Sequence, residues 1–202
     1  MRFIGWTEVP SEIWLRQWSA QYPDDYDEDE YRALIACCDI FQAFHYERIG
    51  KWKDNAKSPA RWRPNVASVA YEIWMQAAAQ LPRCPADQGI LTFLEEWSER
   101  RYQDQYASGT TRVKRFGLSR ASTLLHFISG GHYPIFDSRV VAAVSHLLNS
   151  PMDYTVGSYM DSYCPTFQRL ADACQTTDMR LLDKALFSYG SVVGQLSKVP
   201  LA

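Results

Sequence analysis

Apolar residues recur along this chain at the spacing of one face of a helix. Between Val66 and Ala77 they occupy positions i, i+3, i+4, i+7, i+8 and i+11, which makes a wide stripe for a core to cover. The same spacing is found in 34–41, 90–97, 121–128, 140–148, 167–174 and 181–186. The pattern predicts about eight helices, including a short one after Pro10, and no alternating pair of strands. We therefore expect a mainly α fold.

Short segments rich in Pro, Gly, Asn or Asp separate the predicted helices, and none has the character of a long flexible linker. The acidic run at 24–30 allows two interpretations. Its carboxylates could form a divalent-metal site, but acidic residues at the start of a helix also complement the helix dipole. We favour the helix start and predict no metal site.

The composition is that of a packed protein, with 47% hydrophobic and 14% aromatic residues in a chain of 202. The net charge is -2, so any binding of nucleic acid must depend on local basic clusters. Five cysteines without a CxxC pair indicate free, buried thiols and a reducing compartment. The sequence has no apolar run of about eighteen residues and no signal-peptide pattern. We expect a soluble cytoplasmic protein with no membrane partner.

Two clusters of basic residues stand out against this balanced charge. The first lies in a predicted loop at 50–64 and includes tryptophans: Lys51, Trp52, Lys53, Lys57, Arg61, Trp62 and Arg63. Cations suit a phosphate backbone and exposed rings suit an unstacked base; the alternative is a solvated loop with its rings folded onto the core. The second surrounds Gly117, in a bend before a helix whose N-terminal N–H groups can hold a phosphate: Arg112, Lys114, Arg115 and Arg120.

The second cluster begins a longer pattern, with RFGLSRA at 115–121, an apolar helix, and IFDSRV at 135–140. The pattern resembles the hairpin motif and the following aspartate of the helix-hairpin-helix superfamily of base-excision DNA glycosylases. Gly117 matches the second hairpin glycine, Ala121 the packed alanine and Asp137 the catalytic aspartate. Ser119 stands at the family's lysine position, and its interval to Asp137 is the usual one.

Departures from the family pattern indicate which branch of the superfamily, bifunctional or monofunctional, this chain resembles. Arg115 stands where the first hairpin glycine is expected, which predicts a less tight turn. Ser119 replaces the lysine that forms a Schiff base in bifunctional members, and a hydroxyl cannot form an imine. The resemblance therefore implies a monofunctional enzyme, in which water captures the sugar. Lys114 lies nearby and could take the place of the family lysine if the hairpin is distorted. Cys164 and Cys174 are too few for the C-terminal iron–sulfur cluster of some relatives.

The resemblance implies that the protein binds duplex DNA with a damaged or modified base, flips that base out and hydrolyses its N-glycosidic bond, leaving an abasic site. The sugar becomes oxocarbenium-like as the base leaves, and the Asp137 carboxylate stabilises the cation and orients water. No cofactor is required, although relatives hold a monovalent cation at the hairpin carbonyls. Small enzymes of this superfamily act in genome repair, and some bacterial ones act against phage whose DNA carries hypermodified bases; for this chain a modified cytosine is one candidate target. We expect a monomer that is associated with the bacterial nucleoid when bound to DNA.

The expected architecture is a single glycosylase-like unit over 1–202, with two helical lobes and a cleft between them. Residues 1–106 supply a helical lobe with the basic loop, 107–150 the helix-hairpin-helix and the aspartate, and 151–202 the C-terminal helices. The residues assigned to the base pocket or to stacking are Trp52, Trp62, His132, Tyr133 and His45.

Several of these assignments have a purely structural alternative. An aspartate before a helix is an ordinary N-cap, and the pocket residues can equally pack within the fold. We assign His126, on an apolar helix, to the core. Two other functions remain open: a non-catalytic DNA-binding module that kept the hairpin, and a helical interaction domain, which predicts no salt-sensitive DNA binding.

Overall fold

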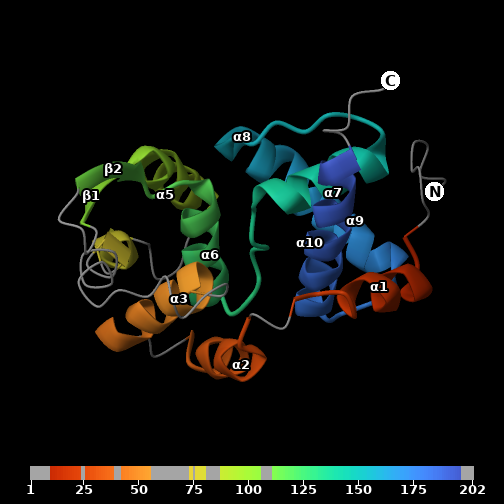
Figure 1. Cartoon of the computed structure of the whole chain (residues 1–202), viewed down its shortest axis with the longest axis horizontal. Helices are drawn as coiled ribbons and strands as arrows, with labels where there is room; N and C mark the ends of the chain where they lie inside the picture. Colours follow the sequence, from red (N-terminus) through yellow and green to blue (C-terminus); the bar gives the residue numbers. More distant parts are fainter. Residues whose placement is uncertain are drawn as a thin grey trace. The chain divides into compact units, whose positions relative to one another are not determined.

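Helices form most of the described chain, which confirms the mainly α fold (Figure 1). The computed structural model describes residues 10–23, 26–38, 42–55, 73–74, 76–80, 87–105 and 111–196. The chain divides into two compact units: unit 1 is Met1–Pro23 with Pro134–Ala202, and unit 2 is Asp24–Tyr133. These divisions differ from those expected after 106 and 150, because both ends of the chain contribute to unit 1. No helix in the described ranges is long and apolar enough to span a membrane.

The elements of unit 2 whose bounds are defined are α2 (Glu28–Ala36), α3 (Ala43–Asn55), α5 (Asp87–Glu99), β1 (Arg101–Gln105), β2 (Thr111–Arg115) and α6 (Leu118–Ile128). Its core includes the fully buried side chains of Ile49, Ile90, Leu94, Leu124 and Leu125. Of the helix predicted over Val66 to Ala77, Ile73, Trp74 and Ala77 are helical and buried; residues 66–72 lie outside the described ranges.

Residues 27–30 of the acidic run form the start of a helix in unit 2. The carboxylate of Asp27 accepts the N–H of Glu30 at 2.9 Å, and Glu28, Asp29 and Glu30 form the first turn of α2. Within the part of the chain that the structure describes, no three His, Cys, Asp or Glu side chains are grouped as metal ligands would be. The helix-start interpretation of this run is confirmed.

The antiparallel pair β1–β2 corrects the expectation of no paired strands. In its register Arg101 lies opposite Arg115 and Tyr102 opposite Lys114. Most side chains of the two strands are polar, so hydrophobic alternation does not reveal them. Arg112, Lys114 and Arg115 therefore lie on a strand and not in a bend. The element directly before Gly117 is β2, where the family pattern predicts a helix.

Unit 1 is built around α10 (Met179–Leu196), which packs against α7 (Ser138–Leu148) and α1 (Glu12–Ser19). Trp14 and Trp18 of α1 meet the ring of Tyr189 edge-on, with centroids 5.5 and 4.9 Å apart. The remaining elements are α8 (Val156–Ser158), the π-helix η3 (Tyr159–Tyr163) and α9 (Cys164–Ala173). The N-terminal helix therefore completes the core of the C-terminal part of the chain.

The cysteines of the described residues are free thiols, as predicted: Cys37, Cys38, Cys164 and Cys174. Cys174 is buried and the other three are half-buried. Burial raises the pKa of Cys164 to about 12 and that of Cys174 to about 11. Because a thiol attacks as its thiolate, these two are poor nucleophiles at neutral pH. Cys84 lies outside the described residues.

Candidate active site around Asp137

Asp137 is the N-cap of α7. Its backbone is extended, and its Oδ1 accepts the N–H groups of Arg139 at 2.8 Å and Val140 at 3.2 Å. The side chain is half-buried, and no donor from a described residue hydrogen-bonds to Oδ2. The positive end of the helix dipole favours a negative charge here. The capping role of Asp137 is confirmed, and it uses one of the two carboxylate oxygens.

Three tyrosine hydroxyls hold the segment that leads to Asp137. Tyr159, Tyr163 and Tyr154 donate to the successive carbonyl oxygens of residues 134, 135 and 136, at 2.9, 3.1 and 3.1 Å. This segment belongs to neither a helix nor a sheet, so its carbonyls need side-chain donors. The tyrosines, which all come from 154–163, therefore fix the path of the backbone up to the candidate catalytic residue.

Two of these tyrosines belong to the π-helix η3 and are fully buried. Their rings and that of Tyr154 surround Phe136, with centroid separations of 4.8 to 5.3 Å. Burial raises the pKa of Tyr163 well above its ordinary value, and the charges of Asp183, Cys164 and Asp137 act in the same direction. Its hydroxyl therefore remains a hydrogen-bond donor. Single-turn π-helices are frequent at functional sites.

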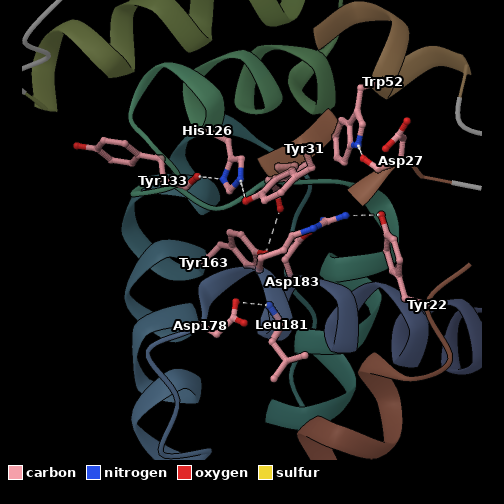
Figure 2. Close-up of polar contacts among 12 residues, drawn as sticks. Tyr22, Asp27, Tyr31, Trp52, His126, Tyr133, Tyr163, Asp178, Leu181 and Asp183 are labelled. Atoms are coloured by element: carbon pink, nitrogen blue, oxygen red, sulfur yellow. Dashed lines mark hydrogen bonds and ion pairs between the residues drawn. The ribbon is translucent and has the colours of Figure 1, made fainter. Parts of the chain in front are cut away.

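A buried ion pair lies on α10, in the same unit. Arg180 and Asp183 are 2.6 Å apart, with only 10% and 8% of their side-chain surfaces exposed. Arg180 also donates to the hydroxyl of Tyr22 at 3.2 Å and lies over its ring; Figure 2 shows Tyr22 and Asp183. Asp183 is not among the site residues predicted from the sequence. The available signal was the opposite charges at i and i+3 in RLLD.

In unit 2, Gly117 is the N-cap residue of α6. Its φ is +82°, a left-handed value that favours glycine, and its carbonyl accepts the N–H groups of Arg120 and Ala121 at 3.1 Å. Ala121 is fully buried, as a packed alanine should be. No side chain caps the N-terminus of α6. Its first N–H groups therefore suit an anion.

Arg120 stabilises the turn of the hairpin motif at 115–121. Its guanidinium donates to the carbonyl oxygen of Phe116 at 3.1 Å and approaches that of Arg115 at 3.5 Å. The side chain is half-buried. A positive charge of the protein therefore lies at the carbonyls to which the resemblance assigns a monovalent cation.

The other predicted residues of this region differ in exposure. Arg115 is exposed and pairs with Glu99 at 3.1 Å, and Lys114 is half-buried on the opposite face of β2. Arg112 lies on the same strand, but its side chain is outside the described residues. Ser119, in the first turn of α6, is half-buried and belongs to unit 2, whereas Asp137 belongs to unit 1. The two residues assigned to catalysis therefore come from different units.

His126 is a core residue, as predicted, with 1% of its surface exposed. Its Nδ1 lies 2.7 Å from the carbonyl oxygen of Tyr133, which requires a proton on Nδ1, so Nε2 accepts the Tyr31 hydroxyl at 2.8 Å (Figure 2). Tyr133 is half-buried, and His132 is exposed with its ring against Tyr133. Of the two predicted pocket residues in this loop, His132 is thus the more accessible.

Two further predicted base contacts, Trp52 and His45, are buried in unit 2. Trp52 is 6% exposed, and its indole N–H donates to the carbonyl oxygen of Asp27 at 3.1 Å (Figure 2). It packs against Tyr26, Tyr31 and Phe127. The assignment of Trp52 to base stacking is therefore wrong, because the chain around it is the helix α3 and its ring is on the apolar face.

His45 is also buried and acts at the start of α3. Its Nδ1 accepts the N–H of Gln42 at 2.9 Å. Burial, with the nearby charge of Arg48, lowers its pKa. Lys51 and Lys53 lie on α3 and not in a loop, and Lys51 pairs with Glu47 at 2.7 Å. The other residues of the predicted basic loop, Lys57, Arg61, Trp62 and Arg63, lie outside the described residues.

Comparisons with protein-family models, with curated proteins and with solved structures found no match to this chain. Function must therefore be inferred from the residues themselves. Unit 1 offers a carboxylate on a rigid support, and unit 2 offers a basic strand that leads into an uncapped helix N-terminus.

Proposed function

We propose that this protein is a monofunctional DNA N-glycosylase in which Asp137 stabilises the sugar cation. The observation that carries the proposal is the support of this carboxylate. Oδ1 is held by two N–H groups, Oδ2 accepts no hydrogen bond from a described residue, and three tyrosine hydroxyls hold the residues before it. A helix cap requires only the first of these features, whereas a catalytic group requires rigid positioning.

The proposed reaction is a heterolytic cleavage followed by addition of water. The bond between C1′ of the sugar and the base nitrogen breaks, and its electron pair leaves with the base. The resulting oxocarbenium-like sugar is stabilised by the negative charge of Asp137. A water molecule then adds its oxygen to C1′ and loses a proton, with Asp137 as the nearby base. The departing base takes up a proton from solvent, Asp137 returns its proton to solvent, and the products are the neutral free base and an abasic site.

Unit 2 supplies the proposed contacts to DNA. Lys114 and Arg115 lie on the strand that leads into Gly117, and the first turn of α6 has no side-chain cap. Cationic side chains and helix N-termini are the groups that most often contact backbone phosphates. Ser119 stands where a lyase would carry its lysine, so water captures the sugar and the strand is not cleaved directly.

The proposal is tested with oligonucleotides that carry oxidised, alkylated, deaminated, mismatched and glycosylated bases. Abasic sites are scored by strand cleavage with and without hot alkali. We expect alkali-dependent cleavage of one class of modified oligonucleotide. The rate of base release should be lower by at least about 100-fold in Asp137→Asn, a loss typical of removing one electrostatic contact to a transition state. Because Asn is as good an N-cap as Asp, the variant keeps the helix and loses only the charge.

A matched control is Asp178→Asn, since Asp178 accepts the N–H of Leu181 at 2.9 Å at the start of α10 (Figure 2). This variant removes a capping charge from the same unit and should retain full activity. If the wild-type protein binds DNA but releases no base from the whole panel, catalysis is excluded for these substrates, and the alternative of a non-catalytic DNA-binding module replaces the proposal.

A further inference from the structure

One face of the β1–β2 pair is exposed to solvent at every residue whose side chain is described. Alternate residues of a strand point to the same face, and on this face Arg101, Gln103, Thr111, Val113 and Arg115 are all exposed. Val113 is 62% exposed. Tyr102 and Lys114, on the opposite face, are half-buried. Only one side of the hairpin thus packs on unit 2, and the other is open to a partner.

Two arginines lie directly opposite each other on this open face. Arg101 is the register partner of Arg115, and directly opposed residues have Cβ atoms about 5 Å apart. Like charges in such a pair destabilise a sheet. No described residue forms an ion pair with Arg101. Among the described residues Arg115 pairs only with Glu99, in an exposed contact with 57% and 67% of the two side chains accessible. Exposed pairs of this kind stabilise little, so the guanidinium of Arg115 can exchange partners.

The surrounding charge is strongly positive. Residues 100–120 carry six basic side chains and one acidic one, Asp104: Arg100, Arg101, Arg112, Lys114, Arg115 and Arg120. The chain as a whole has a net charge of -2, so this positive charge is local. From Arg115 the chain continues through Phe116 and Gly117 into the uncapped N-terminus of α6. Basic groups and free N–H groups therefore follow one another along a single stretch of unit 2.

We infer that the open face of the hairpin binds the phosphate backbone of duplex DNA, with Arg101 and Arg115 converging on one phosphate. The planar guanidinium groups can each form paired hydrogen bonds with phosphate oxygens. The phosphate cancels the repulsion between the two arginines. This inference rests on the proposed function for its partner, and it adds Arg101, a residue outside the glycosylase motif, to the DNA-binding surface.

The test measures binding of an undamaged fluorescent duplex by anisotropy over a series of salt concentrations. Each phosphate contact contributes about 0.9 to the slope of log Kd against log salt. We expect Arg101→Gln and Arg115→Gln each to weaken binding by about 3-fold to 10-fold and to reduce the slope by about 0.9 or less. Because both arginines bind one phosphate, the double variant should lose about one contact and not two. Arg101→Lys, which keeps the charge, should retain the slope.

Arg32→Gln is the control, because Arg32 is an exposed arginine of the same unit in an i,i+3 pair with Asp29. It should bind as the wild type does. An Arg101→Gln variant that remains folded by circular dichroism and also binds like the wild type would overturn the inference. So would a wild-type protein without salt-dependent binding. If binding depends on Arg101 while no base is released from any substrate, the inference stands and the glycosylase proposal fails.

Discussion

The carboxylate of Asp137 caps α7 through one oxygen, and its other oxygen accepts no hydrogen bond from a described residue. Oδ1 accepts two N–H groups of α7, and the backbone before it is held by tyrosine hydroxyls and not by a neighbouring strand. A single side-chain hydrogen bond is worth only about 1 kcal/mol net, but a buried carbonyl left without a donor costs about 1–3 kcal/mol. The tyrosine hydroxyls therefore stabilise the backbone that positions Asp137, chiefly because its buried carbonyls would otherwise lack donors.

Tyr163→Phe and Tyr154→Phe test this support. Tyr163 is fully buried and donates to the carbonyl of Ile135, so its loss leaves that carbonyl without a donor and should lower the free energy of unfolding by about 1–3 kcal/mol. Tyr154 is 42% exposed, and water can replace its hydroxyl, so the cost should be below about 0.5 kcal/mol. Urea denaturation at 25 °C measures both. Equal losses would contradict this account.

His45 predicts a dependence of stability on pH. Its pKa is lowered in the folded state, chiefly by burial, so the unfolded chain binds a proton more readily as the pH falls below the ordinary value of about 6.5. The free energy of unfolding should therefore fall as the pH drops below that value, and His45 should account for at most about 1.4 kcal/mol of this loss per pH unit. Protonation of Nδ1 would also remove the acceptor for the N–H of Gln42.

The variant that isolates this effect is His45→Gln, since glutamine three residues after a helix cap can accept the same N–H without titrating. The urea midpoints of variant and wild type are measured at pH 7.5 and at pH 5.5. The difference between the two midpoints should be smaller at pH 5.5, because only the wild type loses stability through protonation of His45. A wild-type excess in stability that is the same at both values would rule out His45 as the titrating group.

At the scale of elements, the site depends on how closely α10 crosses α7. A Cβ added at Gly190 would collide with the backbone carbonyl of Arg139 and lie 3.2 Å from the Cβ of Ala143. The guanidinium of Arg139 lies over the ring of Phe187, 4.4 Å from its centroid. The first turn of α7, which Asp137 caps, is therefore held against α10 by a contact that only glycine allows.

Gly190→Ala should destabilise unit 1 by about 1–3 kcal/mol, because overpacking at a backbone contact outweighs the usual gain of about 0.5–1 kcal/mol from replacing glycine in a helix. Gly194→Ala on the same helix is the matched control. Its Cβ would be 3.6 Å from that of Ala142, an ordinary contact, so this variant should be neutral or more stable. Thermal and urea unfolding compare the two, and a stabilised Gly190→Ala would show that the helices do not cross so closely.

At the scale of the whole molecule, the chain divides into two units of different construction. Unit 2 is continuous in sequence and carries the basic hairpin, whereas unit 1 combines the two ends of the chain and carries Asp137. Tyr22, near the N-terminus, contacts Arg180 of α10. Truncation at the N-terminus would therefore remove packing from the unit that holds the carboxylate.

The sequence by itself determined the features that depend on neighbouring residues. Helical periodicity predicted the mainly α fold, the acidic run predicted a helix start, and the position of Asp137 before an apolar helix allowed an N-cap. Periods, caps and turns are set by interactions within a few residues, so they can be recognised locally.

Tertiary structure decided which side chains reach one another and which reach solvent. Trp52 carries the same basic neighbours whether its ring is exposed or buried, and only the packing of α3 in unit 2 placed it in the core. The β1–β2 pair has too few apolar residues to show a period, and its stability depends on pairing across strands. The tyrosines at 154–163 meet the carbonyls at 134–136 only once α7 and η3 have packed, because contacts distant in sequence depend on the whole fold.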